Sequence, residues 1–432
     1  MRVLNSSMNS SNEELLYNFT NGVEIDSLLY KQEIQVQKEW ACSLSEIGVL
    51  TSDEKEKVLK ELNIVCEMMK SGDFQWSLAD EDIHMNIERY LTENLGDLGK
   101  KIHLGRSRND LIATTLRIYT KDSLQIISDL LNRLKLKINE KAESWEKIIV
   151  PGLTHVQAGM PVSLKVIISA HEEAVRRDLV RVSNAQNACM DFCPLGAAAF
   201  AGTHLNINLN ELSSRLGFSG PVKNTYDAVG DRDFILESLN CFSVIGVHLS
   251  RLCEELIYYS SSFVGLLKLP ADLSTGSSIM PNKRNPDVIE LVRAKMAKVI
   301  ACSSEGANLV KVVHPSYGSD LHELKGTFVR AIQELQQSLE IMIPFVETLV
   351  VCELKAKELC NSGHILATDI ANFYCKSGKS FRDAYVSVAS LVERANSIGV
   401  QIHELLEGNE EIDFWSYLDK VRGLDKTFFA KN

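Results

Sequence analysis

Proline is scarce in this chain, with nine residues in 432, and long stretches also lack glycine. Both residues interrupt helices, because proline removes a backbone hydrogen bond and glycine loses more conformational entropy on folding. Their absence predicts helices well above the ordinary mean of about 11–12 residues. Four ranges carry this signal: 106–150 and 162–193 contain neither residue, 231–264 contains only Gly246, and 287–314 contains only Gly306.

Other absences narrow the class of protein. The ten cysteines include no CxxC pair, which disfavours a structural zinc site and favours reduced thiols. No apolar run is long enough to cross a membrane, and the N-terminal residues lack the apolar segment of a signal peptide. Basic residues number 46 against 57 acidic ones, giving a net charge of −11. Because no basic patch stands out either, we expect a cytoplasmic protein that binds neither nucleic acid nor membrane.

The predicted long helices carry a wide apolar stripe, of which Leu111, Ile112 and Leu116 are examples. Such a stripe indicates a helix bundle, and helices this long and apolar indicate a bundle shared between subunits. We therefore expect an all-α fold of three parts. These are a helical N-terminal domain over 1–105, a central long-helix bundle over 106–357 that forms the oligomer core, and a small helical C-terminal domain over 358–432.

Local signals refine this outline. Thr51 with Glu54 forms the pattern of a capping box, for a helix that reaches about Lys70. Ser380 with Asp383 predicts the start of another helix near the C-terminus. Strand signals are weak, although residues 199–209 are compatible with a short β-hairpin.

The most distinctive stretch is 276–286, which reads GSSIMPNKRNP. Glycine and two serines make a polar loop, Lys283 adds a cation, and Pro286 with Asp287 suits the first turn of a helix. A loop that leads into a helix N-terminus can hold an anion. Taken alone, these residue types are also typical of an ordinary solvated loop.

Three further polar segments lie directly before the predicted long helices. They read GRSRND at 105–110, PGLTHVQ at 151–157 and DAVGDRD at 227–233. Each has an ordinary interpretation: helix capping in the first, a structural histidine in the second and a solvated charged turn in the third. Each also offers hydrogen-bond donors or a titratable group next to a helix N-terminus.

Together these segments resemble the argininosuccinate lyase and δ-crystallin family, within the fumarase/aspartase superfamily of lyases. GSSIMPNKRNP matches the superfamily signature GSSxMPxKxNP, and the family carries GRSRND, PGxTHxQ and DAxxxRD in the order found here. DEDIH at 80–84 and LATD at 366–369 match as well. The resemblance runs from about residue 14 to about residue 400. It implies a long-helix bundle and a homotetramer with composite active sites. The sequence contains no complete P-loop, HExxH or GxGxxG motif, so we expect no cofactor or metal.

The resemblance also implies a reaction. A proton leaves the carbon beside a carboxylate, the C–N bond breaks, and fumarate is released; from argininosuccinate the other product is arginine, which belongs to arginine biosynthesis. Removing that proton concentrates negative charge on one carboxylate, so donors must lie where the charge develops. By match to the family, Ser277 is the base, and His155 paired with Glu290 is the acid or proton relay. Family accounts assign base and acid differently between Ser277 and His155.

The remaining site residues are assigned by the same match. Thr154 belongs with the catalytic group and helps to hold a carboxylate. The residues assigned to substrate binding are Ser107, Asn109, Lys283 and Asn285 for the succinyl side, Asp26, Asp82, Arg232, Tyr317 and Lys325 for the arginine side, and Arg108 without a stated side.

Three positions depart from the family pattern. Gly22 stands where the family has the serine of Asn-Ala-Ser, Leu111 replaces the Gln after GRSRND, and His322 replaces the Gln of YNxDxQEDK. The residues for elimination are intact, whereas the region that holds the leaving amine is altered. Three hypotheses follow: an argininosuccinate lyase, a related lyase that releases fumarate from a different N-substituted aspartate, or a non-catalytic, crystallin-like structural paralogue.

Overall fold

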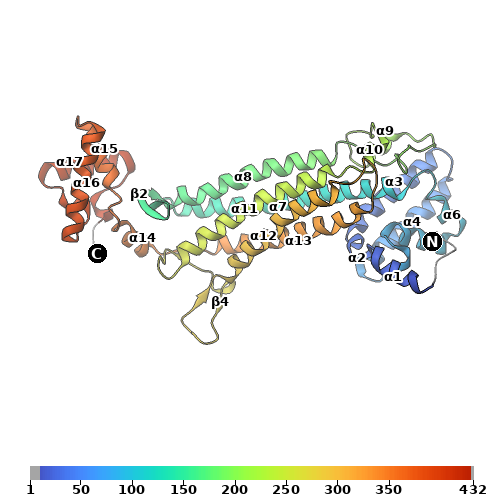
Figure 1. The fold of residues 1–432 in the computed structure, drawn as a ribbon, viewed down its shortest axis with the longest axis horizontal. Helices are drawn as coiled ribbons and strands as arrows, with labels where there is room; N and C mark the ends of the chain where they lie inside the picture. Colours follow the sequence, from blue (N-terminus) through green and yellow to red (C-terminus); the bar gives the residue numbers. More distant parts are fainter. Residues whose placement is uncertain (1–9, 430–432) are drawn as a thin grey trace. The chain divides into compact units, whose positions relative to one another are not determined.

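The computed structural model describes residues 10–429, and helices make up most of them (Figure 1). The chain divides into two compact units, which are described separately. Unit 1 takes in Met1–Leu130, Asp178–Val247 and Ala294–Ser338, and unit 2 takes in Leu131–Arg177, His248–Arg293 and Leu339–Asn432. The three-part domain division expected from the sequence stays a prediction.

Unit 1 begins with short helices, and their start signals are those read in the sequence. The hydroxyl of Thr51 accepts a hydrogen bond from the Glu54 backbone N–H at 3.2 Å, and the Glu54 carboxylate accepts one from the Thr51 N–H at 2.8 Å. This confirms the predicted capping box. The helices and 3-10 turns of this part are α1 (Ser10–Thr20), α2 (Val23–Asp26), η1 (Ser27–Leu29), α3 (Tyr30–Glu46), α4 (Ser52–Ser71), η2 (Leu78–Asp80), α5 (Ile83–Leu95) and α6 (Asp97–Lys101).

Long helices occupy the ranges that lack glycine and proline, as predicted. A further long helix, α13, contains Pro344 in its last turn. Each long helix contributes its first residues to one unit and its last residues to the other. They are α7 (Arg108–Ser144), α8 (Leu164–Cys189), α11 (Asp233–Ser260), α12 (Asp287–Val310) and α13 (Asp320–Glu347), all labelled in Figure 1.

Short elements complete both units. In unit 1 these are α9 (Leu209–Arg215) and α10 (Thr225–Ala228). In unit 2 three antiparallel strand pairs occur among the described residues: β1 (Ile149–Thr154) with β2 (Gln157–Ser163), β3 (Leu267–Lys268) with β6 (Val350–Val351), and β4 (Thr275–Gly276) with β5 (Arg284–Asn285). The helices of unit 2 include η3 (Ala271–Leu273), α14 (Glu353–Cys360), α15 (Ala367–Lys376), α16 (Phe381–Ile398), η4 (Ile402–Leu405), α17 (Gly408–Arg422) and η5 (Lys426–Phe429).

The hairpin suggested for residues 199–209 is wrong, because this segment forms turns without a strand. The Gly202 N–H donates to the Ala197 carbonyl at 2.8 Å, and the Thr203 N–H donates to the Gly196 carbonyl at 2.9 Å. The Asn109 side chain donates to the Ala199 carbonyl at 3.2 Å. These groups bond within local turns and to α7, so they are not available for a strand ladder.

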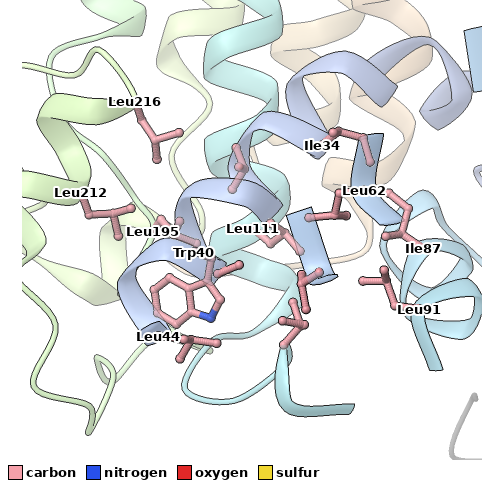
Figure 2. Close-up of a cluster of buried hydrophobic side chains, with 14 of the residues drawn as sticks. Ile34, Trp40, Leu44, Leu62, Ile87, Leu91, Leu111, Leu195, Leu212 and Leu216 are labelled. Atoms are coloured by element: carbon pink, nitrogen blue, oxygen red, sulfur yellow. The ribbon is translucent and has the colours of Figure 1, made fainter. Parts of the chain in front are cut away.

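The core of unit 1 gathers around Trp40 of α3 (Figure 2). Side chains from α4, α5, α7 and α9 converge on it, and full burial of each large apolar side chain contributes about 1.5–3 kcal/mol. The indole N–H of Trp40 donates to the Leu104 carbonyl at 3.2 Å, directly before GRSRND. The cluster therefore fixes the segment from which α7 begins. Its labelled members are Ile34, Trp40, Leu44, Leu62, Ile87, Leu91, Leu111, Leu195, Leu212 and Leu216.

A second apolar cluster lies in unit 2, among α14 to α17, with Phe414 and Ile370 fully buried. The predicted cap of α16 is confirmed, because the Ser380 hydroxyl accepts a hydrogen bond from the Asp383 N–H at 3.2 Å. All ten cysteines are unpaired. Among the described residues, no helix combines the length and apolar character needed to cross a bilayer.

Candidate active site

The signature loop lies in unit 2 and is closed at its base by two strands. β4 pairs with β5 so that Thr275 lies opposite Asn285 and Gly276 opposite Arg284. α12 begins two residues after β5, at Asp287, whose carboxylate accepts a hydrogen bond from the Thr275 hydroxyl. The loop is therefore anchored to the N-terminus of a long helix, as the sequence predicts.

Ser277 directly follows β4 and is half-buried. Its hydroxyl oxygen accepts hydrogen bonds from the backbone N–H groups of Ile279 at 3.3 Å and Met280 at 3.1 Å. Two donors aimed at one oxygen stabilise negative charge on it. A serine in this arrangement can reach its alkoxide form more readily than a free serine.

The other end of the loop lines a cavity of about 870 Å³ within unit 2. Lys283 is exposed and Asn285 is half-buried, and both line this cavity together with Glu290 from the first turn of α12. A cation, an amide and a helix N-terminus in one cavity form a setting that suits a carboxylate ligand.

His155 lies at the tip of the hairpin formed by β1 and β2. Thr154 pairs with Gln157, which leaves His155 and Val156 as a two-residue turn with φ angles of 55° and 60°. Such turns need positive φ at both positions and are usually built from glycine or asparagine. A β-branched residue there is an outlier, and outliers of this kind cluster at functional sites. The backbone thus holds an exposed His155 in a defined position next to Thr154.

The pairing expected between predicted catalytic residues is not seen among the described residues of unit 2. Across the described residues 10–429, no hydrogen bond or ion pair joins His155 to Glu290 or to Ser277. The pairing of His155 with Glu290 therefore stays a prediction.

A separate polar pocket of about 60 Å³ lies in unit 1. It is formed by the segment around α2, the start of α5, the start of α7 and the start of α13. Predicted binding residues that line it are Asp26, Asp82, Arg108, Asn109, Tyr317 and Lys325, and they are joined by Glu81, His84, Ile112 and His322.

Charge pairs organise this pocket. Lys325 and Asp26 form an ion pair and are both buried, at 4% and 0% exposure. Arg108 donates to Asp82 at 2.9 Å and to Glu81 at 3.2 Å. Burial opposes the charge on Arg108, but these two carboxylates outweigh it and raise the pKa of Arg108 above its usual value.

One hydrogen-bond acceptor in the pocket has no donor in the described part of the chain. The Oδ2 atom of Asp26 is buried and has no hydrogen-bond partner among the described residues. A buried polar atom without a partner costs about 1–3 kcal/mol. Such an atom in the lining of a pocket is well placed to receive a donor from a ligand.

His84 forms the back of the pocket and was not assigned a role from the sequence, although it lies in the DEDIH match. Its Nδ1 atom lies 2.8 Å from the Glu33 carboxylate, and both residues are buried. Burial alone would lower the pKa of His84, but Glu33 and Asp82 raise it above its usual value. Glu33 also accepts hydrogen bonds from Gln37 at 2.6 Å and Thr115 at 2.8 Å. No sequence pattern pointed to Glu33.

Two predicted binding residues, Arg232 and Ser107, line neither this pocket nor the cavity of unit 2. Arg232 is 3% exposed and donates to the carbonyls of Asp231 at 2.6 Å and Val229 at 3.4 Å, and burial lowers its pKa to about 10. The Ser107 hydroxyl accepts a hydrogen bond from the Asn109 N–H at 3.3 Å, at the start of α7. Both contacts support local structure.

The three positions that depart from the family pattern lie in two different parts of unit 1. Leu111 is 3% exposed and belongs to the core cluster around Trp40, so it replaces a polar residue with an apolar one in the core. His322 lines the pocket of unit 1, and Gly22 lies against the His322 ring. No group of three or more His, Cys, Asp or Glu in the described part of the chain could hold a metal ion.

Comparison with known proteins decides the family. Residues 7–301 match the model of a family described as lyase. Argininosuccinate lyase of Nitratidesulfovibrio vulgaris (strain Miyazaki F) is 37% identical over 391 residues, covering 90% of this chain and 85% of the relative. The chloroplastic argininosuccinate lyase of Arabidopsis thaliana is 36% identical over 392 residues, covering 91% of this chain and 76% of the relative. This chain belongs to the argininosuccinate lyase family.

Solved structures agree with this family at the level of fold. EDDS lyase in complex with formate has a TM-score of 0.80 at 23% identity, covering 99% of this chain and 84% of that one. A fumarate lyase:delta crystallin from Brucella melitensis bound to cobalt has a TM-score of 0.81 at 18% identity, covering 95% of each chain. The all-α fold of the superfamily, predicted from the sequence, is therefore confirmed.

Proposed function

We propose that this chain releases fumarate from argininosuccinate and leaves arginine, as a step of arginine biosynthesis. The observation that carries the proposal is the 37% identity to an argininosuccinate lyase over 90% of this chain. The signature loop and the hairpin at His155 supply groups that this elimination needs.

Ser277 is the base in this proposal. Its oxygen takes the proton from the carbon beside a substrate carboxylate, and the electron pair of that C–H bond moves onto the carboxylate. The N–H groups of Ile279 and Met280 support the charge that Ser277 carries before the transfer. When the electron pair returns, it forms the double bond of fumarate, and the C–N bond breaks with its electrons going to nitrogen.

The leaving nitrogen then needs a proton, and His155 supplies it with Glu290 as its partner. A carboxylate beside an imidazole favours the charged ring and fixes its orientation. Lys283, Asn285 and Thr154 hold the substrate carboxylates and offset the charge that develops on them. Ser107 and Asn109 extend this set from the start of α7.

The pocket of unit 1 binds the amine part of the substrate, and we call it the amine pocket. Its carboxylates suit a guanidinium group, because each carboxylate oxygen accepts the N–H donors that such a group presents. Asp26 has a buried oxygen without a partner for this purpose. Tyr317, Lys325 and Arg108 bind the polar remainder, and Arg232 stabilises the turn beneath Tyr317.

We further propose a cytoplasmic homotetramer in which several copies of the chain build each site. Most groups proposed for elimination lie in unit 2, whereas Ser107, Asn109 and the groups proposed for the amine lie in unit 1. Wide apolar stripes on the long helices favour association between copies.

A second candidate is a related lyase that acts on a different N-substituted aspartate. The observation that favours it is a pair of replacements: His322 lines the pocket of unit 1, and Gly22 lies against it. The elimination would be the same and the leaving amine would differ.

The test is the ultraviolet absorbance of fumarate. The purified protein is incubated with argininosuccinate and then with other N-substituted aspartates. Release from argininosuccinate supports the first proposal, and release only from another substrate supports the second. A protein that releases fumarate from none of them is not an enzyme of this type.

A further inference from the structure

Gly22 lies against the side chain of His322. A methyl group added at Gly22 would lie 2.3 Å from Nε2 and 2.5 Å from Cε1 of this imidazole. Gly22 has a φ angle of −116°, which any residue adopts, so the backbone does not require glycine here. Glycine is needed for space, because the imidazole occupies the volume that a side chain at position 22 would fill.

This contact joins the start of α2 to the start of α13. The Asp26 N–H donates to the Gly22 carbonyl at 2.9 Å, so these two residues lie one turn apart. Lys325 lies one turn beyond His322 and pairs with Asp26. The two contacts, Gly22 with His322 and Asp26 with Lys325, hold the imidazole at the edge of the amine pocket.

The same edge carries an independent sign of a ligand. Asp26 is fully buried, and its Oδ2 atom has no hydrogen-bond partner among the described residues. An acceptor of this kind, in the lining of a pocket, is matched by an N–H donor from the molecule that fills the pocket. His322 lines the same pocket.

We propose that His322 determines which leaving amine the enzyme accepts, and that Gly22 provides the space for its ring. The amine part of the substrate packs against the imidazole and donates an N–H to Asp26. The substrate class is N-substituted aspartates whose amine carries a cationic group rich in N–H donors, such as an amidinium or a guanidinium. This inference rests on the proposed function, because it concerns the amine that the elimination releases.

The charge state of the His322 ring suits a substrate with a cationic amine. Burial and the neighbouring Lys325 lower the pKa of His322, and they outweigh Asp26, Glu323 and Asp82, which favour the charged form. The ring is therefore neutral at neutral pH. A neutral imidazole hydrogen bonds to a cationic amine without repelling it.

The experiment compares four forms: the natural protein, Gly22→Ser, His322→Gln and the double variant. For each form, kcat/KM is measured by fumarate release from argininosuccinate and from N-(2-aminoethyl)aspartate. Serine at position 22 displaces the ring, so this change is expected to lower kcat/KM for the preferred substrate about tenfold, mainly through KM. Gln at position 322 restores the space, so the double variant is expected to recover most of the loss. Gly220→Ser is the matched control, because a side chain at Gly220 meets nothing within 4 Å.

The outcomes separate this inference from the proposed function. If the natural protein acts on N-(2-aminoethyl)aspartate alone, the proposed function fails. The effect of Gly22 and His322 is then measured as kcat/KM for that substrate. The inference would be overturned if the double variant lost kcat/KM by the product of the two single losses. It would also be overturned if all four forms showed the same preference between the two substrates. His322→Ala removes the ring without a clash, so it must change the preference even if Gly22→Ser does not fold. Fumarate release from no substrate contradicts both proposals.

Discussion

At the scale of single residues, the proposed elimination depends most on the hydroxyl of Ser277. Replacing it with a methyl group removes the oxygen that takes the proton, whereas the groups that bind the substrate remain. We expect Ser277→Ala to lower kcat by about 10²–10⁴-fold with little change in substrate affinity. Stopped-flow measurement of fumarate and equilibrium binding of argininosuccinate check the two parts. Ser278→Ala, at the next position of the same loop, is the control, and equal losses in both variants would contradict the role of Ser277.

His322 is expected to make substrate binding in the amine pocket weaker in acidic solution. Its pKa is lowered from the ordinary value, so the ring is neutral at neutral pH and gains a proton only in more acidic solution. That proton adds a positive charge beside Lys325, where a cationic amine binds. We expect KM for argininosuccinate to rise as the solution is made acidic, and this rise to be absent in His322→Gln. Steady-state kinetics of both forms between neutral and acidic pH provide the measurement, and identical KM profiles would exclude the effect.

The sequence located many of these residues but not their grouping. GRSRND, DEDIH and the signature loop named Arg108, Asp82 and Lys283 by resemblance. The apolar stripe already indicated a buried Leu111, but the sequence did not indicate that His322 faces Gly22, because that contact depends on which helices meet. Glu33 was missed altogether, since a single acidic residue within a helix carries no pattern of its own.

At the scale of single elements, the capping box of α4 makes stability depend on pH. The Lys101 side chain and the Thr51 backbone N–H both bond to the Glu54 carboxylate and lower its pKa to about 2. In the unfolded chain this pKa is about 4.3. The folded value is the lower one, so the stabilisation is fully present above the unfolded pKa and is lost as the pH falls towards 2.

We expect Glu54→Gln to lower the melting temperature at pH 7. The difference from the natural protein should shrink as the pH falls below about 4, because the natural carboxyl then becomes protonated as well. Thermal unfolding followed by circular dichroism at several pH values gives both curves. A difference that is independent of pH would show that the ionised carboxylate is not what stabilises α4.

Helix α7 contains a charge that its apolar pattern did not reveal. Arg117 is 2% exposed, forms an ion pair with Asp231, and donates to the Cys189 carbonyl at 3.0 Å. Its guanidinium lies 3.9 Å from the ring centre of Phe192 and 4.5 Å from that of Phe234. The guanidinium is thus held by one carboxylate and two aromatic rings, whereas its buried Nε has no hydrogen-bond partner among the described residues.

We expect Arg117→Leu to destabilise the protein by about 3–5 kcal/mol, because it leaves the Asp231 charge without its partner. Adding Asp231→Asn should return part of that loss. Urea unfolding monitored by tryptophan fluorescence measures all three forms. Arg133→Leu, on an exposed part of the same helix, should change stability by less than about 0.5 kcal/mol. Equal effects at the two arginines would contradict the importance of the buried pair.

Long helices could be predicted because the absence of glycine and proline is visible in the sequence itself. The turns at 199–209 could not, because their backbone groups bond to Asn109 and to neighbouring turns instead of a strand. The two-residue turn at His155 and Val156 was also not foreseen, since neither residue type is usual at positive φ.

At the scale of the whole molecule, the proposed composite site makes a test of assembly possible. His155→Ala and Ser277→Ala should each be inactive alone. If different copies of the chain supply these residues to one site, mixing the two variants under conditions of subunit exchange restores intact sites. We expect partial recovery of fumarate release in the mixture and none in either variant alone. A mixture as inactive as its components would indicate that one chain supplies both residues.

The close approach of Gly22 to His322 also bears on how such a pocket changes over evolutionary time. With the imidazole in place as observed, a side chain at position 22 meets the ring. The glycine substitution is therefore the permissive step, and the histidine substitution follows it along a path without a steric block. In the opposite order, the intermediate carries a ring and a side chain in one volume. A change of leaving amine on this scaffold then takes two substitutions, with glycine at position 22 before histidine at position 322.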